Sequence, residues 1–148
     1  MNCQVYVSFA TDNEVLYHQE KLPFTCSPIG AALSGTLSSI TLLKNSTSEW
    51  REVVRIWLKT EDRKVIDAIS WTNTEIQNRA TIINRKIDPS SQAGLQIEIS
   101  PSSVKCSDSG VYKCSINGNG DVFKSESAPI TVRIKAEPTS PFPLIEHL

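Results

Sequence analysis

Short segments in which apolar and polar residues alternate follow one another along most of the chain. In LQIEI (95–99) the three aliphatic side chains fall on one face of an extended backbone, and ITVRI (130–134) repeats the pattern. A side-chain period of two is typical of a half-buried β-strand. About nine segments of this kind occur: QVYVSF, LPFTC, SITLLK, REVVRIWLK, KVIDAISW, ATIINRKI, LQIEI, VYKCSI and ITVRI.

Turn-forming residues separate these segments, as in SPIG, KTEDRK, DPSSQAG and NGNGD. Gly, Pro, Asn and Asp in such clusters favour turns between strands. No segment has a helical apolar period over ten residues or more. About nine regularly spaced strands in a chain of 148 residues predict an all-β fold, a sandwich of two sheets in one domain.

The alternating pattern stops at the start of KAEPTSPFPLIEHL. Pro138, Pro141 and Pro143 lie within six residues there, and proline cannot donate a hydrogen bond to a sheet. We therefore predict one domain over residues 1–136 and a proline-rich linker or tail over 137–148.

Charge and hydropathy argue against several classes of partner. The chain has 15 basic and 16 acidic residues, mixed along its length, with a net charge of −1. This balance gives no electrostatic basis for binding nucleic acid or an anionic membrane surface. The densest apolar run, VVRIWL, contains an arginine and is far shorter than the roughly 18 residues that span a bilayer. We expect no nucleic-acid partner and no membrane insertion of this fragment.

The cysteine count favours disulfides and an oxidising, extracellular compartment. The spacing of the four cysteines contains no C-x2-C pair, and the chain has only two histidines, so we expect no metal site. We also expect no enzyme and no cofactor, because the chain has no G-x-S-x-G motif and no phosphate-binding loop. The cysteines are Cys3, Cys26, Cys106 and Cys114.

Asn45 begins the sequence Asn-Ser-Thr, the only N-glycosylation acceptor sequence in the chain. In an oxidising compartment we expect this asparagine to carry a glycan on a surface loop.

The segment DSGVYKC (108–114) resembles the D-x-G-x-Y-x-C motif of the immunoglobulin superfamily. The resemblance implies a disulfide between Cys26 and Cys114 that joins two sheets, and a tyrosine corner at Tyr112. RATI, which begins at Arg79, is similar to the R-F-T-I of V-type domains and implies an ion pair between Arg79 and Asp108. The segments REVVRIWLK and KVIDAISW correspond to the additional strands C′ and C″. A V-type Greek-key β-sandwich is therefore expected.

The chain departs from the family pattern in two places. Leu42 stands where strand C usually has a tryptophan, while the three tryptophans are elsewhere, at Trp50, Trp57 and Trp71. Trp57 lies on the face opposite the apolar residues of its segment, and we interpret it as a compensating core aromatic, with an exposed contact residue as the alternative. Strand G lacks the G-x-G bulge of antibody domains, and SESAPITV is expected to run straight through Pro129.

Cys106 carries a finer resemblance. The segment SPSSVKCSDSGVYKC is similar to the immunoglobulin modules of molluscan fibrinogen-related proteins, which are secreted immune lectins. Strand A is expected to begin at the end of the sandwich opposite Cys106. Eight residues of strand cover roughly 26 Å, whereas a disulfide tolerates only about 7 Å between Cα atoms. Cys3 and Cys106 could form an unorthodox internal bridge, pair with another chain or domain, or stay free.

Together these features predict an extracellular recognition module of an invertebrate-type innate immune protein, secreted or part of a cell-surface ectodomain, which binds a protein or glycan through loops or a sheet face. The loops considered are 28–38, 60–64 and 117–121, at one end of the sandwich. The alternatives are a structural spacer or multimerisation module, and a homophilic adhesion domain that self-associates. The candidate binding residues are Trp50, Trp57, Trp71, Asn117, Asn119 and Asp121.

Overall fold

The computed structural model describes residues 6–29, 37–118 and 124–135. The expected tail at 137–148, and with it the predicted end of the domain, lies outside these residues. The helical elements are α1 (Thr74–Gln77) and the 3-10 turns η1 (Ser90–Gln92), η2 (Pro101–Ser103) and η3 (Cys106–Asp108). The strands are β1 (Tyr6–Thr11), β2 (Glu14–Leu16), β3 (Leu22–Ile29), β4 (Leu37–Ser46), β5 (Glu49–Glu61), β6 (Lys64–Trp71), β7 (Ala80–Lys86), β8 (Gly94–Ile99), β9 (Gly110–Gly118), β10 (Lys124–Glu126) and β11 (Ile130–Lys135).

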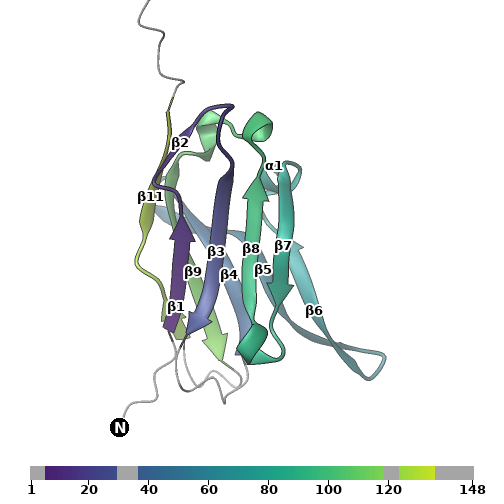
Figure 1. Cartoon of the computed structure of the whole chain (residues 1–148). Helices are drawn as coiled ribbons and strands as arrows, with labels where there is room; N and C mark the ends of the chain where they lie inside the picture. Colours follow the sequence, from purple (N-terminus) through teal and green to yellow (C-terminus); the bar gives the residue numbers. More distant parts are fainter. Residues whose placement is uncertain (1–5, 30–36, 119–123, 136–148) are drawn as a thin grey trace, which may run out of the picture.

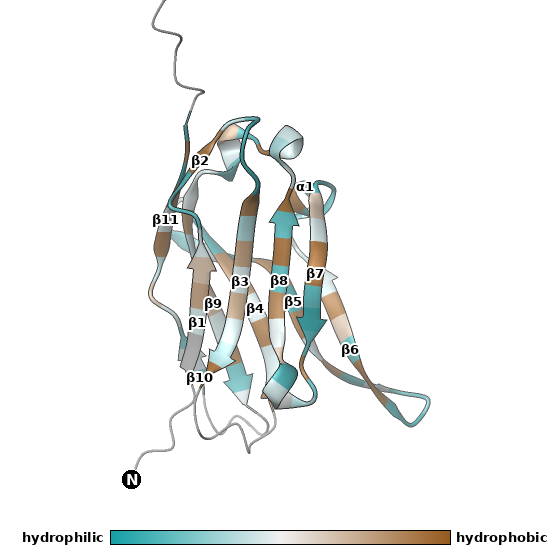
Figure 2. Cartoon of the chain, viewed as in Figure 1, coloured by the Kyte–Doolittle hydropathy of each residue, from teal (hydrophilic) through white to brown (hydrophobic). Residues whose placement is uncertain are grey.

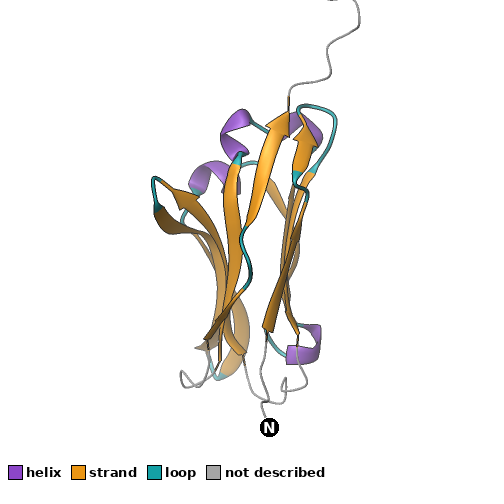
Figure 3. Cartoon of the chain, turned by 90° about the vertical axis from the view of Figure 1, so that its left-hand side faces the viewer, coloured by secondary structure: helices purple, strands orange, loops and turns teal. Residues whose placement is uncertain are grey.

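These strands form two sheets packed face to face (Figures 1 and 3), which confirms the predicted all-β sandwich. The four-stranded sheet has the order β1-β3-β8-β7. The seven-stranded sheet has the order β2-β11-β9-β4-β5-β6, and β10 pairs with β9 beside this path. Among the described residues, no helix has the length and apolar character needed to cross a membrane.

Each of the nine alternating segments overlaps a strand in the part of the chain that the structure describes. The structure adds two strands of three residues each, β2 and β10, which are too short to show a period in the sequence. β2 pairs in parallel with β11, so the N-terminal part of the chain crosses from one sheet to the other between β1 and β2.

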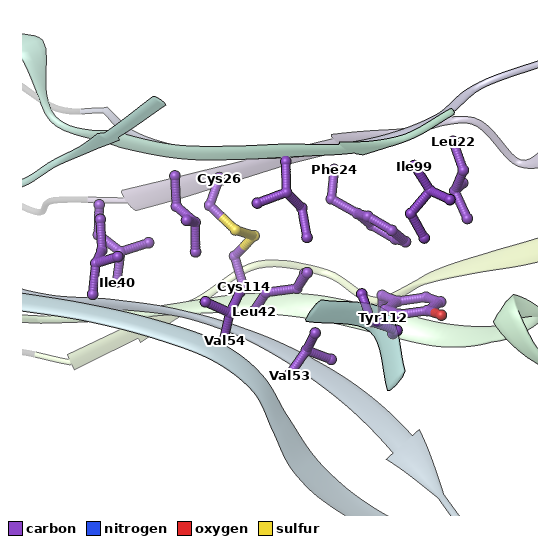
Figure 4. Packing of buried hydrophobic residues seen from close by; sticks show 14 of the residues in the cluster. Leu22, Phe24, Cys26, Ile40, Leu42, Val53, Val54, Ile99, Tyr112 and Cys114 are labelled. Carbon is purple, nitrogen blue, oxygen red and sulfur yellow. A yellow bond between two sulfur atoms is a disulfide. The ribbon is translucent and has the colours of Figure 1, made fainter. Parts of the chain in front are cut away.

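The core lies between the sheets and is built from the apolar half of each alternating strand (Figures 2 and 4). In β3, Leu22, Phe24 and Cys26 are buried while the residues between them are partly exposed. Cys26 and Cys114 form a disulfide with their Cα atoms 5.8 Å apart, linking β3 of one sheet to β9 of the other. Closing a loop of this length stabilises the fold by about 4–5 kcal/mol on the chain-entropy estimate.

Leu42, where the resemblance to immunoglobulin domains leads us to expect a tryptophan, lies beside this disulfide. It lies directly opposite Cys114 on β9 and is 1 % exposed. Phe24 and Tyr112 supply the buried aromatic volume, with ring centroids 4.6 Å apart. The interpretation of Trp57 as the compensating core aromatic is wrong, because Trp57 lies on the outward face of β5, opposite Ser39, and stays half-buried.

The last strand does not run straight, which corrects a second expectation. Glu126 lies opposite Ser115, but Ile130 lies opposite Tyr112, so the pairing shifts by one residue between β10 and β11. Ser127 fills the break: its N–H donates to the Cys114 carbonyl and its hydroxyl accepts from the Cys114 N–H, both at 2.9 Å. A bulge is therefore made without glycine.

Candidate functional site

An ion pair closes the end of the sandwich that carries α1 and η3. The Arg79 guanidinium donates two hydrogen bonds to the Asp108 carboxylate, at 2.7 and 2.8 Å, and a third to the Ser103 carbonyl at 2.7 Å. The Asp108 side chain is 1 % exposed and also accepts the Lys105 N–H at 2.8 Å. The hydrogen bonds to Asp108 raise the pKa of Arg79. This buried, hydrogen-bonded ion pair is structural.

Tyr112 belongs to the same structural unit. Its hydroxyl donates a 2.6 Å hydrogen bond to the backbone carbonyl of Asp108, four residues earlier, and the residue is fully buried. Burial raises the pKa of the phenol far above its usual range, so the hydroxyl remains a neutral donor. This is the geometry that the term tyrosine corner describes.

Lys44 packs against the η3 turn and the Tyr112 ring at this end of the sandwich. Its Nζ donates to the Ser107 carbonyl at 2.7 Å and lies 5.5 Å from the centroid of the Tyr112 ring. Burial lowers the pKa of this ammonium group. Gly110 lies against this lysine and has a φ of 156°, a backbone conformation that other residues rarely adopt. The polar groups at this end hold the turn, and they do not form a ligand site.

Cys106 is exposed on η3 and has no disulfide partner among the described residues. β1 runs antiparallel to β3 with Tyr6 opposite Ile29, so it begins at the end of the sandwich away from η3 (Figure 1). Cys3 lies outside the described residues. The three alternatives for these two cysteines therefore remain predictions.

Three of the candidate binding residues, Trp50, Trp57 and Asn117, lie on the solvent-facing side of the seven-stranded sheet, which we call the outward face. The sheet register places Asn117, Ser39 and Trp57 in one row across β9, β4 and β5. Asn45 and Trp50 lie opposite each other in a second row on the same face. A period of two does not predict that Trp50 and Trp57 share a face, because they are seven positions apart in the sequence.

A β-bulge brings Trp50 and Trp57 to one face. The β4–β5 pairing shifts by one residue between Leu42 and Leu43, which leaves Val53 as an extra residue in β5. Val53 is buried beside its neighbour, so the alternation of side chains is reversed from there on. Without the bulge, a period of two would put the two indoles on opposite faces.

Between the two tryptophan rows the outward face has a hollow of about 340 Å³. Small side chains form the floor of the hollow, where Thr41 and Ser115 lie opposite each other and are each 7 % exposed. At one end the Asn117 amide donates to the Ser39 hydroxyl at 3.1 Å. The residues that line the hollow are Thr41, Leu43, Trp50, Glu52, Arg55, Lys113, Ser115, Asn117, Lys124 and Glu126.

A cation lies against each indole. Lys113 Nζ is 4.2 Å from the centroid of the Trp50 ring and also forms a 3.0 Å ion pair with Glu126. The Arg55 guanidinium is 5.4 Å from the centroid of the Trp57 ring. Such cation–π contacts contribute about 0.5–1 kcal/mol at exposed sites. They restrain Trp50 and Lys113 in the lining of the hollow, and Arg55 against Trp57 beside it, before any partner binds.

Trp71 does not belong to this surface. It lies opposite Val54, whose side chain points inward, and packs against the core. Asn119 and Asp121 lie outside the described residues, as do residues 30–36 of the expected B–C loop. The 60–64 loop is a tight turn between β5 and β6, with Asp62 and Arg63 at φ of 50° and 64°.

Sequence reasoning missed the floor and most of the rim of the hollow. Thr41, Arg55, Lys113 and Ser115 carry no motif, and only the register of the neighbouring strands shows that they meet. The sequon also differs from expectation, since Asn45 lies in β4, one residue from its end, and not in a loop.

In the described part of the chain, His, Cys, Asp and Glu side chains form no group of three or more that could hold a metal ion. Comparison with protein-family models and with curated proteins gives no match to this chain.

Proposed function

We propose that this chain is a V-type immunoglobulin domain that acts as an extracellular recognition module and binds a partner protein through the outward face. The strand orders support the family assignment. One sheet reads A-B-E-D and the other A′-G-F-C-C′-C″, which is the arrangement with the additional C′ and C″ strands. The disulfide, the Tyr112 corner and the Arg79–Asp108 pair occupy the places that the family pattern gives them.

Cys106 in the turn before β9, and Leu42 in place of the strand C tryptophan, favour the finer proposal of an immune module like those of molluscan fibrinogen-related proteins. The disulfide fits an oxidising compartment outside the cytosol.

The observation that carries the binding proposal is the pair of half-buried, cation-stacked tryptophans on one face: Trp50 lines the hollow, and Trp57 packs with Arg55, which also lines it. Tryptophan and arginine are enriched at the energetic centres of protein interfaces. Trp50 with Lys113 and Trp57 with Arg55 provide two such anchors on one face. Their order in the free domain lowers the entropy cost of binding.

The two central strands of the four-stranded sheet present no such tryptophan anchors to solvent. These strands, β3 and β8, present Pro23, Thr25, Gln96 and Glu98, none of which is aromatic. This contrast favours the seven-stranded sheet as the binding face.

The lining of the hollow favours a protein partner over a small molecule. Small-molecule sites are enclosed and mostly apolar. Here the floor is polar and the rim carries both Glu52 and Glu126 and the cations Arg55, Lys113 and Lys124. A rim with both signs of charge suits a partner surface whose own charges alternate.

The test compares two double variants of the domain. Arg55→Ala with Trp57→Ala removes one anchor, and Thr25→Ala with Gln96→Ala is the matched control on the other sheet. Both are immobilised and exposed to fractionated extracellular proteins and to a glycan array. Binding of a protein that only the first variant loses supports the proposal. Equal binding by both variants, or binding of glycans alone, contradicts it.

Two further measurements separate the alternatives. A spacer module would bind nothing by itself while the longer protein that contains it binds normally. A homophilic domain would self-associate with increasing concentration in sedimentation equilibrium, and the Arg55→Ala, Trp57→Ala variant would not.

A further inference from the structure

We propose that Asn45 carries an N-linked glycan whose first sugar packs on Trp50, so that partner docking is confined to the end of the outward face around Arg55 and Trp57. This inference rests on the binding function proposed above and specifies how the site is restricted.

The geometry of the β4–β5 hairpin brings acceptor and indole together. Asn45 on β4 lies directly opposite Trp50 on β5, and both side chains belong to the outward face. Side chains that are directly opposite in an antiparallel pair have Cβ atoms about 4.5–5.5 Å apart. A sugar on the Asn45 amide therefore begins its path beside the indole.

The acceptor sequence is also presented for modification. Thr47, its third residue, is exposed in the tight turn between β4 and β5, where Thr47 and Ser48 have φ of 50° and 67°. Asn45 is half-buried on an open sheet face, two residues from this turn. A sequon at the exposed end of a hairpin is accessible without unfolding of the sandwich.

Trp50 is held in place to receive the sugar. Lys113 lies 4.2 Å from its ring centroid, and Glu126 fixes Lys113 through the 3.0 Å ion pair. A held indole offers a large, rigid apolar surface at little entropy cost, and the apolar face of a pyranose ring can pack against it.

The glycan covers only part of the outward face. Thr41, on the floor of the hollow, is four residues from Asn45 along β4, roughly 14 Å at 3.4 Å per residue. Trp57 lies one row further, opposite Ser39. The base of the glycan thus masks the Trp50 end, while the Arg55–Trp57 end stays open to a partner.

The first experiment measures attachment. The chain is secreted from cells that N-glycosylate, as wild type, as Asn45→Gln and as Ser46→Ala, which keeps the acceptor sequence and is the matched control. Intact mass should show the glycan on wild type and Ser46→Ala and its loss from Asn45→Gln. Absence of the glycan from the wild type overturns the inference.

The second experiment measures packing on the indole and needs no partner. In a Trp57→Phe, Trp71→Phe background, Trp50 is the single tryptophan. Acrylamide quenching of its fluorescence should be low with the full glycan, stay low after an endoglycosidase trims it to the first sugar, and rise in Asn45→Gln. If that background is unstable, the packing is measured in the wild type instead, from nuclear Overhauser contacts between the sugar and the Trp50 indole.

The outcomes separate this inference from the proposed function. A glycan that leaves the quenching of Trp50 unchanged, or gives no contact with its indole, overturns the inference even where a partner is found. Protection of Trp50 with no partner on the outward face contradicts the proposed function alone. With a partner in hand, Trp50→Ala should weaken binding only in the Asn45→Gln background.

Discussion

Arg79 and Asp108 share two parallel hydrogen bonds of 2.7 and 2.8 Å, and their side chains are only 11 % and 1 % exposed. Asp108→Asn leaves the guanidinium in place without its counter-charge. Removing one partner of a buried pair costs about 3–5 kcal/mol, and we expect a loss of this size in urea unfolding. Glu98→Gln, which breaks the exposed Lys21–Glu98 bridge, is the control and should cost less than about 1 kcal/mol. Equal losses would contradict a structural role for the Arg79 pair.

The buried phenol of Tyr112 makes stability dependent on alkaline pH. Its pKa is raised from the ordinary value of 10.0, chiefly by burial, so its contribution is complete below pH 10.0 and falls as the pH rises further. One proton gives a slope of up to about 1.4 kcal/mol per pH unit. Tyr112→Phe should abolish this slope in pH-dependent chemical unfolding.

At neutral pH the same variant should lose about 1–3 kcal/mol, because the Asp108 carbonyl loses its donor. Lys44 acts with the opposite sign, since burial lowers its pKa from 10.5 and stability grows as the pH rises toward that value. Repeating the series with Lys44→Met isolates the effect of the phenol. A Tyr112→Phe profile identical to that of the wild type would contradict the assignment.

The two kinds of cysteine should differ sharply in their effect on stability. Replacing both Cys26 and Cys114 by alanine removes the link between the sheets and should cost about 4–5 kcal/mol, measured by guanidinium unfolding. Cys106→Ser changes an exposed residue and should alter the free energy of unfolding by less than about 0.5 kcal/mol.

Introducing a tryptophan at Leu42 should destabilise this domain. Leu42 is 1 % exposed and the aromatic pair of Phe24 and Tyr112 already fills the core. Leu42→Trp should therefore cost about 1–3 kcal/mol through overpacking. Leu43→Trp, one residue along on the outward face, is the matched control and should fold with nearly unchanged stability in thermal unfolding.

Substitution of Arg55 on the outward face should weaken partner binding without lowering the stability of the domain. Arg55 is exposed, so Arg55→Ala should change the free energy of unfolding by less than about 0.5 kcal/mol. Because Arg55 is proposed as an interface anchor, the same substitution should weaken binding of the partner by about 2 kcal/mol or more, which is about thirtyfold in Kd. Calorimetry of unfolding and titration of the partner measure the two quantities on one preparation, and unchanged affinity would exclude Arg55 from the site.

The sequence predicts the sandwich, because alternation along a strand depends on burial alone. It also predicts the Arg79–Asp108 pair and the Tyr112 hydrogen bond, because DSGVYKC and RATI resemble segments that form these contacts in immunoglobulin domains. It does not predict the outward face. Trp50 shares a face with Trp57 only through the bulge at Val53, and only the β5–β6 register, which pairs Trp71 with buried Val54, shows that Trp71 turns inward. Pairing between strands is a long-range property, which a period read along one strand does not contain.

The extra residue at Val53 gives this domain a means of changing its surface without changing its core. A regular pairing of the same residues, without the bulge, would turn the start of β5 over, so that Trp50 would point inward and Arg51 would take its place opposite Asn45 on the outward face. The buried residues beyond Val53 would keep their partners. In such a fold the chemistry of a binding face can be exchanged by a one-residue shift of strand register at one point, which substitutions could achieve only in several coordinated steps.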